Sequence, residues 1–183
     1  MHRILAAAGS DVDVVIIDDD DHIDGDLHHV LADHPKLLDR FRKSRWGQRP
    51  ATYAELEFTL SVNNQMIRGS IDRVDRLEDG TLEIVDFKTG KHRSSEELRS
   101  DLQLPIYALA ASELLGAQPE QIRASLFFLG SDHEWILDWS GDHATDARRT
   151  ITELLDTMAT SSFRKTDDRS KCRHCDFAHI CER

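Results

Sequence analysis

The amino-acid sequence predicts an α/β sandwich in which helices flank a mixed β-sheet. The first observation is the order of its periodic segments, which reads helix, three strands, helix, two strands, helix. The second is its size: 183 residues suffice for one domain with a substantial core and are too few for two comfortable ones. We therefore expect a single α/β domain.

The pattern of the first 45 residues predicts one or two helices, preceded by a segment with no clear helix or strand. The apolar stretch "VDVVII" runs into an acidic segment at 18–21, which indicates a loop or a frayed entry. Between residues 25 and 45, apolar residues recur at helical spacing, which predicts one or two amphipathic helices interrupted near Pro35. The segment "SRWGQRP" then ends this unit. We expect residues 1–24 to be an N-terminal extension or the edge of a fragment.

Three strand candidates follow in quick succession. The segment "YAELEFTLSV" (53–62) alternates between apolar and polar residues, and "MIRGSIDRVDRL" (66–77) is rich in β-branched residues. The third segment, "TLEIVDFK" (81–88), follows the turn "EDG". Short turns between strands predict an antiparallel meander.

The second half of the core reads as helix, hairpin, helix. In "SDLQLPIYALAASELLG", Ser100 or Asp101 can cap the helix, Pro105 falls near the first turn, and Gly116 ends it. The segments "IRASLFFLG" and "HEWILDWS" resemble a hairpin, and "HATDARRTITELLDTMAT" an amphipathic helix. The expected boundaries are a core over 25–160 and a cysteine-containing tail over 161–183.

The net charge of -11 argues against indiscriminate nucleic-acid binding, because an acidic surface repels phosphates. A local basic groove stays possible, as does a merely solvated helix face and tail. No apolar run approaches the length of about 20 residues that a membrane span needs, so we expect a cytoplasmic protein. The basic residues form two groups: Arg40, Arg42, Lys43, Arg45 and Arg49, and Arg164, Lys165, Arg169, Lys171 and Arg173.

A carboxylate and an ammonium stand at the end of the third strand candidate. Side chains two apart on a strand share a face, so Asp86 and Lys88 project together, while Val85 and Phe87 project into the other layer. A structural ion pair is one interpretation. Asp72, on the preceding strand, can lie beside Asp86 in an antiparallel pair and makes a second interpretation available.

Two neighbouring carboxylates repel each other unless a cation lies between them. Mg²⁺ is the obvious candidate, since it takes oxygen ligands and is often held by one or two carboxylates together with substrate phosphate. Lys88 could then orient a water or neutralise developing negative charge. These residue types suit the hydrolysis of phosphodiesters.

The pattern of "GSID" followed by "IVDFKTGK" resembles the PD-(D/E)xK nuclease superfamily, in particular its RecB-like and AddB-like branch. The resemblance implies a restriction-endonuclease-like mixed sheet flanked by helices. It also implies a DNA nuclease that uses Mg²⁺ or Mn²⁺, with Asp72, Asp86 and Lys88 as catalytic residues. Asp72 and Asp86 would be metal ligands, joined by the backbone carbonyl of Phe87.

Two further motifs of that branch occur in family order. In "QLPIY", Gln103 and Tyr107 lie four apart on one helix face, and the resemblance implies that they contact the DNA backbone or support the active site. In "GDLHHVLAD", Gly25 and His29 match a G-x-x-x-H pattern whose histidine is a metal ligand, with His28 as the competitor.

Other carboxylates are weaker candidates. Some relatives place a further carboxylate on the first strand, where this chain has Glu55 and Glu57. Glu57 is a secondary candidate, although an outward-facing strand charge is the simpler interpretation. Asp75 is interpreted as structural or exposed, because the motif matches Asp72.

The cysteines cluster in "KCRHCDFAHICER" with the spacing of metal ligands. Zinc is one interpretation, with a nearby histidine as fourth ligand. The resemblance implies instead a [4Fe-4S] cluster whose first cysteine lies far upstream. The chain has no cysteine upstream, so we expect a longer parent protein, a different fourth ligand, or no cluster. The residues concerned are Cys172, Cys175 and Cys181, with His174 or His179 for zinc.

The resemblance implies an exonuclease domain that degrades single-stranded DNA, works with a helicase region of the same or a partner chain, and serves DNA repair or recombination. One alternative is an inactive DNA-binding or protein-docking module of the same fold. Another is a zinc-binding structural protein, which leaves the charged pair unexplained.

Overall fold

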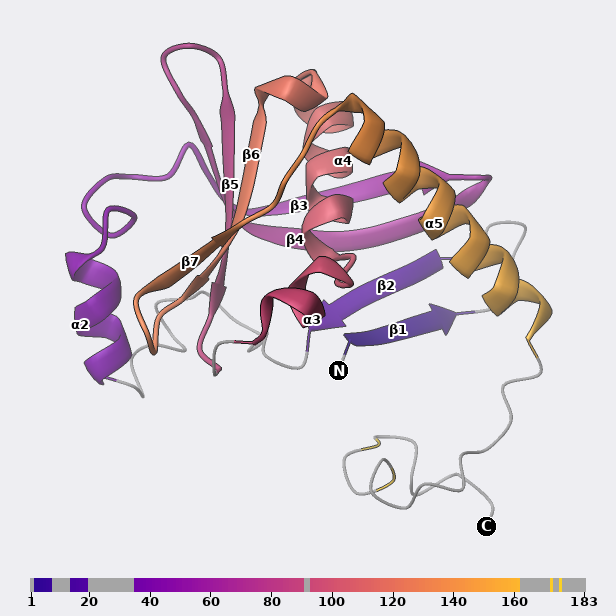
Figure 1. The fold of residues 1–183 in the computed structure, drawn as a ribbon, viewed down its shortest axis with the longest axis horizontal. Helices are drawn as coiled ribbons and strands as arrows, with labels where there is room; N and C mark the ends of the chain where they lie inside the picture. The colour runs from indigo at the N-terminus through magenta and orange to yellow at the C-terminus, as the bar shows by residue number, and fades with distance from the viewer. Residues whose placement is uncertain are drawn as a thin grey trace.

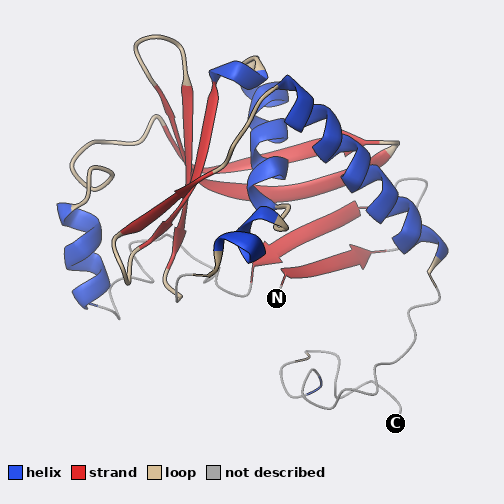
Figure 2. Ribbon diagram, viewed as in Figure 1, coloured by secondary structure: helices blue, strands red, loops and turns tan. Residues whose placement is uncertain are grey.

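The structure is a computed structural model that describes residues 35–90 and 93–161, the backbone of 2–7 and 14–19, and Cys172 and Cys175. These parts contain seven strands in one mixed sheet, with helices beside it (Figures 1 and 2). This confirms the predicted fold class. No helix in these parts is long and apolar enough to cross a membrane. The strands are β1 (His2–Ala7), β2 (Val14–Asp19), β3 (Tyr53–Val62), β4 (Gln65–Arg76), β5 (Leu82–Lys88), β6 (Ile122–Phe128) and β7 (His133–Ile136). The helices are α2 (Pro35–Lys43), α3 (Ser95–Arg99), α4 (Gln103–Leu115), the 3₁₀ helix η1 (Pro119–Gln121) and α5 (Gly141–Thr160).

Strand β4 is the centre of the sheet because it pairs with three other strands. Along one edge it is antiparallel to β3. Along the other edge, residues 66–68 pair with β2 and residues 73–76 pair with β5. Residues 69–72 lie between these two partners, where β5 and β6 turn steeply away from β3 and β4 (Figure 1). The sheet therefore forks at this point.

The two faces of the sheet are covered by different helices. Helices α4 and α5 lie over one face, where Leu82 and Ile84 of β5 join the larger apolar core. Helix α2 packs on the other face, where Val85 and Phe87 form a smaller cluster with Phe41. The alternation of side chains along β5 produces these two clusters.

Helix α4 is largely buried because it lies between the sheet and α5. Eight of its 13 residues are buried. The side chain of Asp101 accepts the N–H of Gln103 at 2.9 Å, Pro105 falls in the first turn, and Gly116 ends the helix with φ 69°. The helix cap is Leu102, so Ser100 and Asp101 do not occupy that position. Gln103, the first residue of α4, is buried and faces the sheet.

Most predicted elements have counterparts in the structure. The antiparallel meander is β3–β4–β5, and the expected hairpin is β6–β7. The sequence alone predicts no strand in residues 1–24, whereas β1 and β2 pair there and join β4. An apolar run of six residues is too short to distinguish a strand from other buried segments. The expected domain boundaries stay predictions.

The glycine of "GSID" is explained by an aromatic ring. Gly69 lies opposite Phe58 of β3, and a Cβ built on Gly69 would come 2.8 Å from Cζ of that ring. The ring cannot move away freely, because it is buried and packs edge-on against Tyr107 of α4 at 5.8 Å between centroids. Only a glycine leaves room for this contact.

We predict that Gly69→Ala lowers the free energy of unfolding by about 1–3 kcal/mol, since the new methyl group overpacks the site. Urea denaturation of the purified chain measures it. In a Phe58→Leu background the same change should cost less, because the ring atoms it would meet are gone. An equal cost in both backgrounds would contradict this explanation.

Candidate active site

Asp86 and Lys88 lie at the end of β5 on the face covered by α4. Both side chains are almost completely buried, with 1% and 2% of the residue exposed. Nζ of Lys88 lies 3.0 Å from Oδ2 of Asp86. Two opposite charges buried this deeply compensate part of each other's desolvation. The pair is therefore as close as the sequence spacing predicts.

Asp72 reaches the same place from β4. The β4–β5 pairing ends at Arg73 opposite Val85, and one step further in this register brings Asp72 opposite Asp86. Oδ2 of Asp72 accepts the backbone N–H of Phe87 at 2.8 Å. A side chain thus takes an N–H of β5 where the strands diverge. This contact ties Asp72 to the residue that follows Asp86 on β5.

Gln103 and Tyr107 approach from α4 and are both buried. Nε2 of Gln103 donates to Oδ1 of Asp86 at 3.0 Å and to the hydroxyl oxygen of Tyr107 at 3.1 Å. Two accepting oxygens at one nitrogen fix the orientation of the amide. Of the two roles that the family resemblance leaves open, this geometry matches support of the active site.

The oxygen atoms gathered here fit a hard divalent cation. Asp72 and Asp86 supply carboxylates, and the carbonyl of Phe87 lies between Asp86 and Lys88 in the chain. Mg²⁺ accepts such a set, because it binds one or two carboxylates and keeps several waters. No group of three His, Cys, Asp or Glu side chains comes together in the described ranges. The third side-chain ligand predicted from sequence, His29, lies outside those ranges, as do Gly25 and His28.

Of the remaining candidates, Glu55 lines a cavity together with Asp72, and the others lie away from this centre or outside the described residues. Glu57 is exposed on β3. Asp75 is buried and holds Arg73 at 2.9 Å, which agrees with a structural role. The N–H of Cys175 donates to the carbonyl of Cys172 at 3.5 Å. Cys181, His174 and His179 fall outside the described residues.

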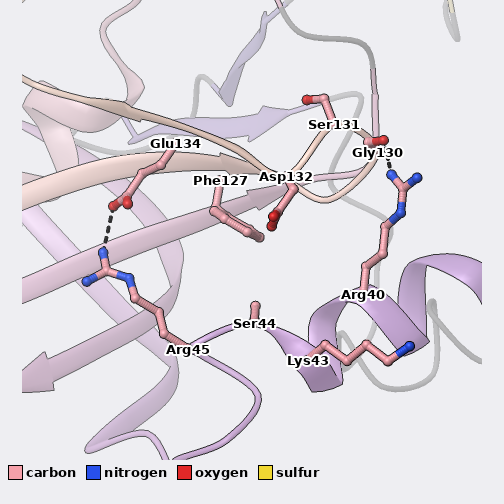
Figure 3. A pocket seen from close by; sticks show the side chains of 9 residues that line it. All are labelled: Arg40, Lys43, Ser44, Arg45, Phe127, Gly130, Ser131, Asp132 and Glu134. Atoms are coloured by element: carbon pink, nitrogen blue, oxygen red, sulfur yellow. Dashed lines mark hydrogen bonds and ion pairs between the residues drawn. The ribbon is translucent and has the colours of Figure 1, made fainter.

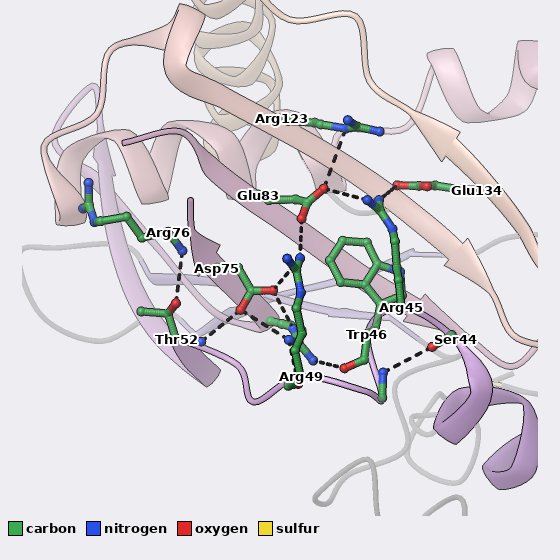
Figure 4. A network of polar contacts seen from close by, with 12 residues as sticks. Ser44, Arg45, Trp46, Arg49, Thr52, Asp75, Arg76, Glu83, Arg123 and Glu134 are labelled. Atoms are coloured by element: carbon green, nitrogen blue, oxygen red, sulfur yellow. Dashed lines mark hydrogen bonds and ion pairs between the residues drawn. The ribbon is translucent and has the colours of Figure 1, made fainter. Parts of the chain in front are cut away.

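A polar network fastens the segment after α2 to the sheet (Figure 4). Trp46 is fully buried, with the guanidinium of Arg45 4.1 Å from its ring centroid. Arg45 and Arg49 also pair with buried Glu83 of β5, at 3.1 and 2.5 Å. Arg73, the neighbour of Asp72, donates to the carbonyl of Trp46 at 2.5 Å. Part of the basic group that sequence suggests as a solvated helix face is therefore structural.

A cavity of about 690 Å³ lies between α2 and the β6–β7 turn (Figure 3). Arg40 spans it and donates to the carbonyls of Leu129 and Gly130. Lys43 lies on its helical wall and pairs with Asp39 at 2.7 Å. The N–H of Leu129 in turn bonds the carbonyl of Lys88 at 2.9 Å. Helix α2 is thus tied to the strand end that carries Lys88.

Comparisons with known proteins show which family and which solved folds the chain is similar to. The sequence model of the PD-(D/E)XK nuclease superfamily matches residues 3–182. No curated protein matches the chain. Similar solved structures include SSO0001, with 20% identity, a TM-score of 0.46, and coverage of 85% of this chain and 70% of that one. Another is a "Putative exonuclease" from Eubacterium rectale, with 11% identity, a TM-score of 0.51, and coverage of 81% and 59%.

The chain belongs to the PD-(D/E)XK nuclease superfamily, because the family model covers nearly its whole length. The resemblance that the motifs indicate is confirmed at this level. The assignment to the RecB-like and AddB-like branch stays a prediction. The chain spans 59% of the Eubacterium rectale protein, and the likeness to that structure concerns the fold.

We predict that Gln103→Met lowers nuclease activity about 10–100-fold, because Asp86 loses the donor that orients its carboxylate. The apolar side chain has a similar length, so the unfolding midpoint should change little. Cleavage rate and Mn²⁺ affinity are measured in parallel. Tyr107→Phe removes only the hydroxyl that accepts a hydrogen bond from Gln103, and it should lower the activity less. Native rate and native Mn²⁺ affinity in Gln103→Met would refute this supporting role.

Proposed function

We propose that the chain is a Mg²⁺- or Mn²⁺-dependent deoxyribonuclease that hydrolyses phosphodiester bonds. The observation that supports this most strongly is the convergence of three strand-borne groups at the fork of the sheet. Asp72 bonds the N–H next to Asp86, and Asp86 pairs with Lys88. A structural ion pair needs only the last two. The additional carboxylate makes the set suitable for a cation and an anionic substrate.

Each group has a distinct role in this proposal. Asp72, Asp86 and the carbonyl of Phe87 would hold the cation, and His29 would complete the set. The bound cation supplies positive charge that stabilises a phosphoryl oxygen as negative charge develops there. Lys88 donates hydrogen bonds that orient the attacking water, while Asp86 keeps its ammonium in place. The attacking water forms a bond to phosphorus and gives up a proton to the solvent, the bond to the leaving oxygen breaks, and that oxygen takes up a proton from the solvent.

We further propose that the substrate is single-stranded DNA degraded from an end, in cytoplasmic repair or recombination, with a helicase region in the same or a partner chain. The motif order typical of RecB-like and AddB-like nucleases supports this. So does the fold similarity to a protein named as an exonuclease.

We predict that Asp86→Asn and Lys88→Met each reduce cleavage by roughly 10²–10³-fold, because each removes a charge at the reacting phosphate. Labelled single-stranded and duplex DNA are incubated with Mn²⁺ and the native chain or its variants. Asp138→Asn and Lys36→Met change the same charges at exposed positions and should cleave normally. DNA binding without cleavage by the native chain would favour an inactive docking module instead.

The cysteine tail is proposed to hold a [4Fe-4S] cluster in the full-length parent, through Cys172, Cys175, Cys181 and one further ligand. The C-x2-C spacing of Cys172 and Cys175, with Cys181 six residues later, supports a shared metal. Zinc is the alternative occupant.

We predict that the chain, or a longer form of its parent, reconstituted without oxygen, contains iron and acid-labile sulfide, and that Cys175→Ser lowers both. Elemental analysis and absorption spectra measure this. A preparation with stoichiometric zinc and no sulfide would replace the cluster with a zinc site.

A further inference from the structure

A cavity of about 530 Å³ opens beside Asp72 on the face of the sheet that α2 covers. We call it the α2 cavity. Asp72, Phe87 and Glu55 line its sheet side, and Arg42 and Trp46 contribute to its other walls. It therefore connects one carboxylate of the candidate active site with the basic helix α2.

Arg42 differs from the other cations of this region. It is exposed, it lines the α2 cavity, and it has no hydrogen bond or ion pair within the described ranges. A guanidinium carries five donors in a rigid fork and binds phosphate through two of them at once. The other cations between residues 40 and 49 are already engaged within the protein: Arg40, Lys43, Arg45 and Arg49.

We propose that Arg42 binds a phosphate of the substrate strand adjacent to the one that is cleaved. This inference rests on the proposed function and adds to it a substrate contact outside the motifs. The strand would enter through the α2 cavity, with one phosphate at Asp72 and its neighbour at Arg42.

Charge supports this path. The chain carries a net charge of -11, and the α2 cavity itself contains the carboxylates of Asp72 and Glu55. An anionic strand approaching this place needs cations from the protein as well as from a bound metal. Arg42 is held where it can act, because the residues after α2 are anchored to β4 and β5 through Trp46 and Glu83. Its position is thus fixed while its guanidinium stays available.

The adjacent residue provides a matched control. Lys43 has the same charge on the same helix, but successive helical residues point in different directions, and Lys43 lines the other cavity (Figure 3). Binding of a labelled single-stranded oligonucleotide is measured by fluorescence anisotropy over a series of KCl concentrations. A chelator is present, so that cleavage plays no part. Steady-state cleavage with Mn²⁺ is measured separately.

We expect Arg42→Gln to weaken binding about tenfold and to reduce the salt slope by about one. In cleavage, KM should rise while kcat stays close to native. Lys43→Gln should alter binding less than twofold, and Arg42→Lys should restore the salt slope with incomplete affinity.

Equal effects of Arg42→Gln and Lys43→Gln would overturn the proposal in favour of general attraction. So would a loss of kcat with unchanged binding. A native chain that binds DNA with this dependence on Arg42 but never cleaves it would refute the proposed function and leave the phosphate contact standing.

Discussion

The candidate site depends on the way β4 divides one of its edges between two partners. Because β2 pairs with residues 66–68 and β5 with residues 73–76, the intervening residues lie where the sheet opens. A strand that diverges there leaves backbone donors to be satisfied. Asp72 accepts the N–H of Phe87 and so continues the connection with a side chain. The same contact brings a carboxylate to the end of β5, where Asp86 and Lys88 already stand.

Strand β5 then serves two layers at once. All of its residues are buried, so each of its charges needs a partner inside the protein. Toward α4, Asp86 is matched by Lys88 and Gln103. Toward α2, Glu83 is matched by Arg45 and Arg49. The first set lies at the fork of the sheet, whereas the second fastens α2 to the sheet. Sequence spacing alone does not distinguish these two kinds of buried charge.

Much of the fold could be predicted from local patterns. The segment predicted as a strand over 53–62 has the same bounds as β3. The predicted helix that ends at Gly116 is α4. The antiparallel β4–β5 pairing that leads up to Asp72 and Asp86 also followed from a meander with short turns. The fork of β4 could not be predicted, because it depends on β2, a strand distant in sequence. The sequence also could not predict which cation between residues 40 and 49 makes no hydrogen bond or ion pair within the described ranges. That property of Arg42 depends on which acceptors the fold brings near each side chain.

The motifs that contain Gly69, Asp86 and Gln103 are separate in the sequence but are joined by one series of contacts in the structure. Gly69 makes room for the ring of Phe58, which packs on Tyr107. Tyr107 accepts a hydrogen bond from Gln103, which also holds Asp86. A glycine on β4 is therefore linked to a carboxylate on β5 through the helix between them. Substitutions along this chain should couple rather than add, because each contact positions the next one. The motifs therefore belong to one packing arrangement around the fork of the sheet.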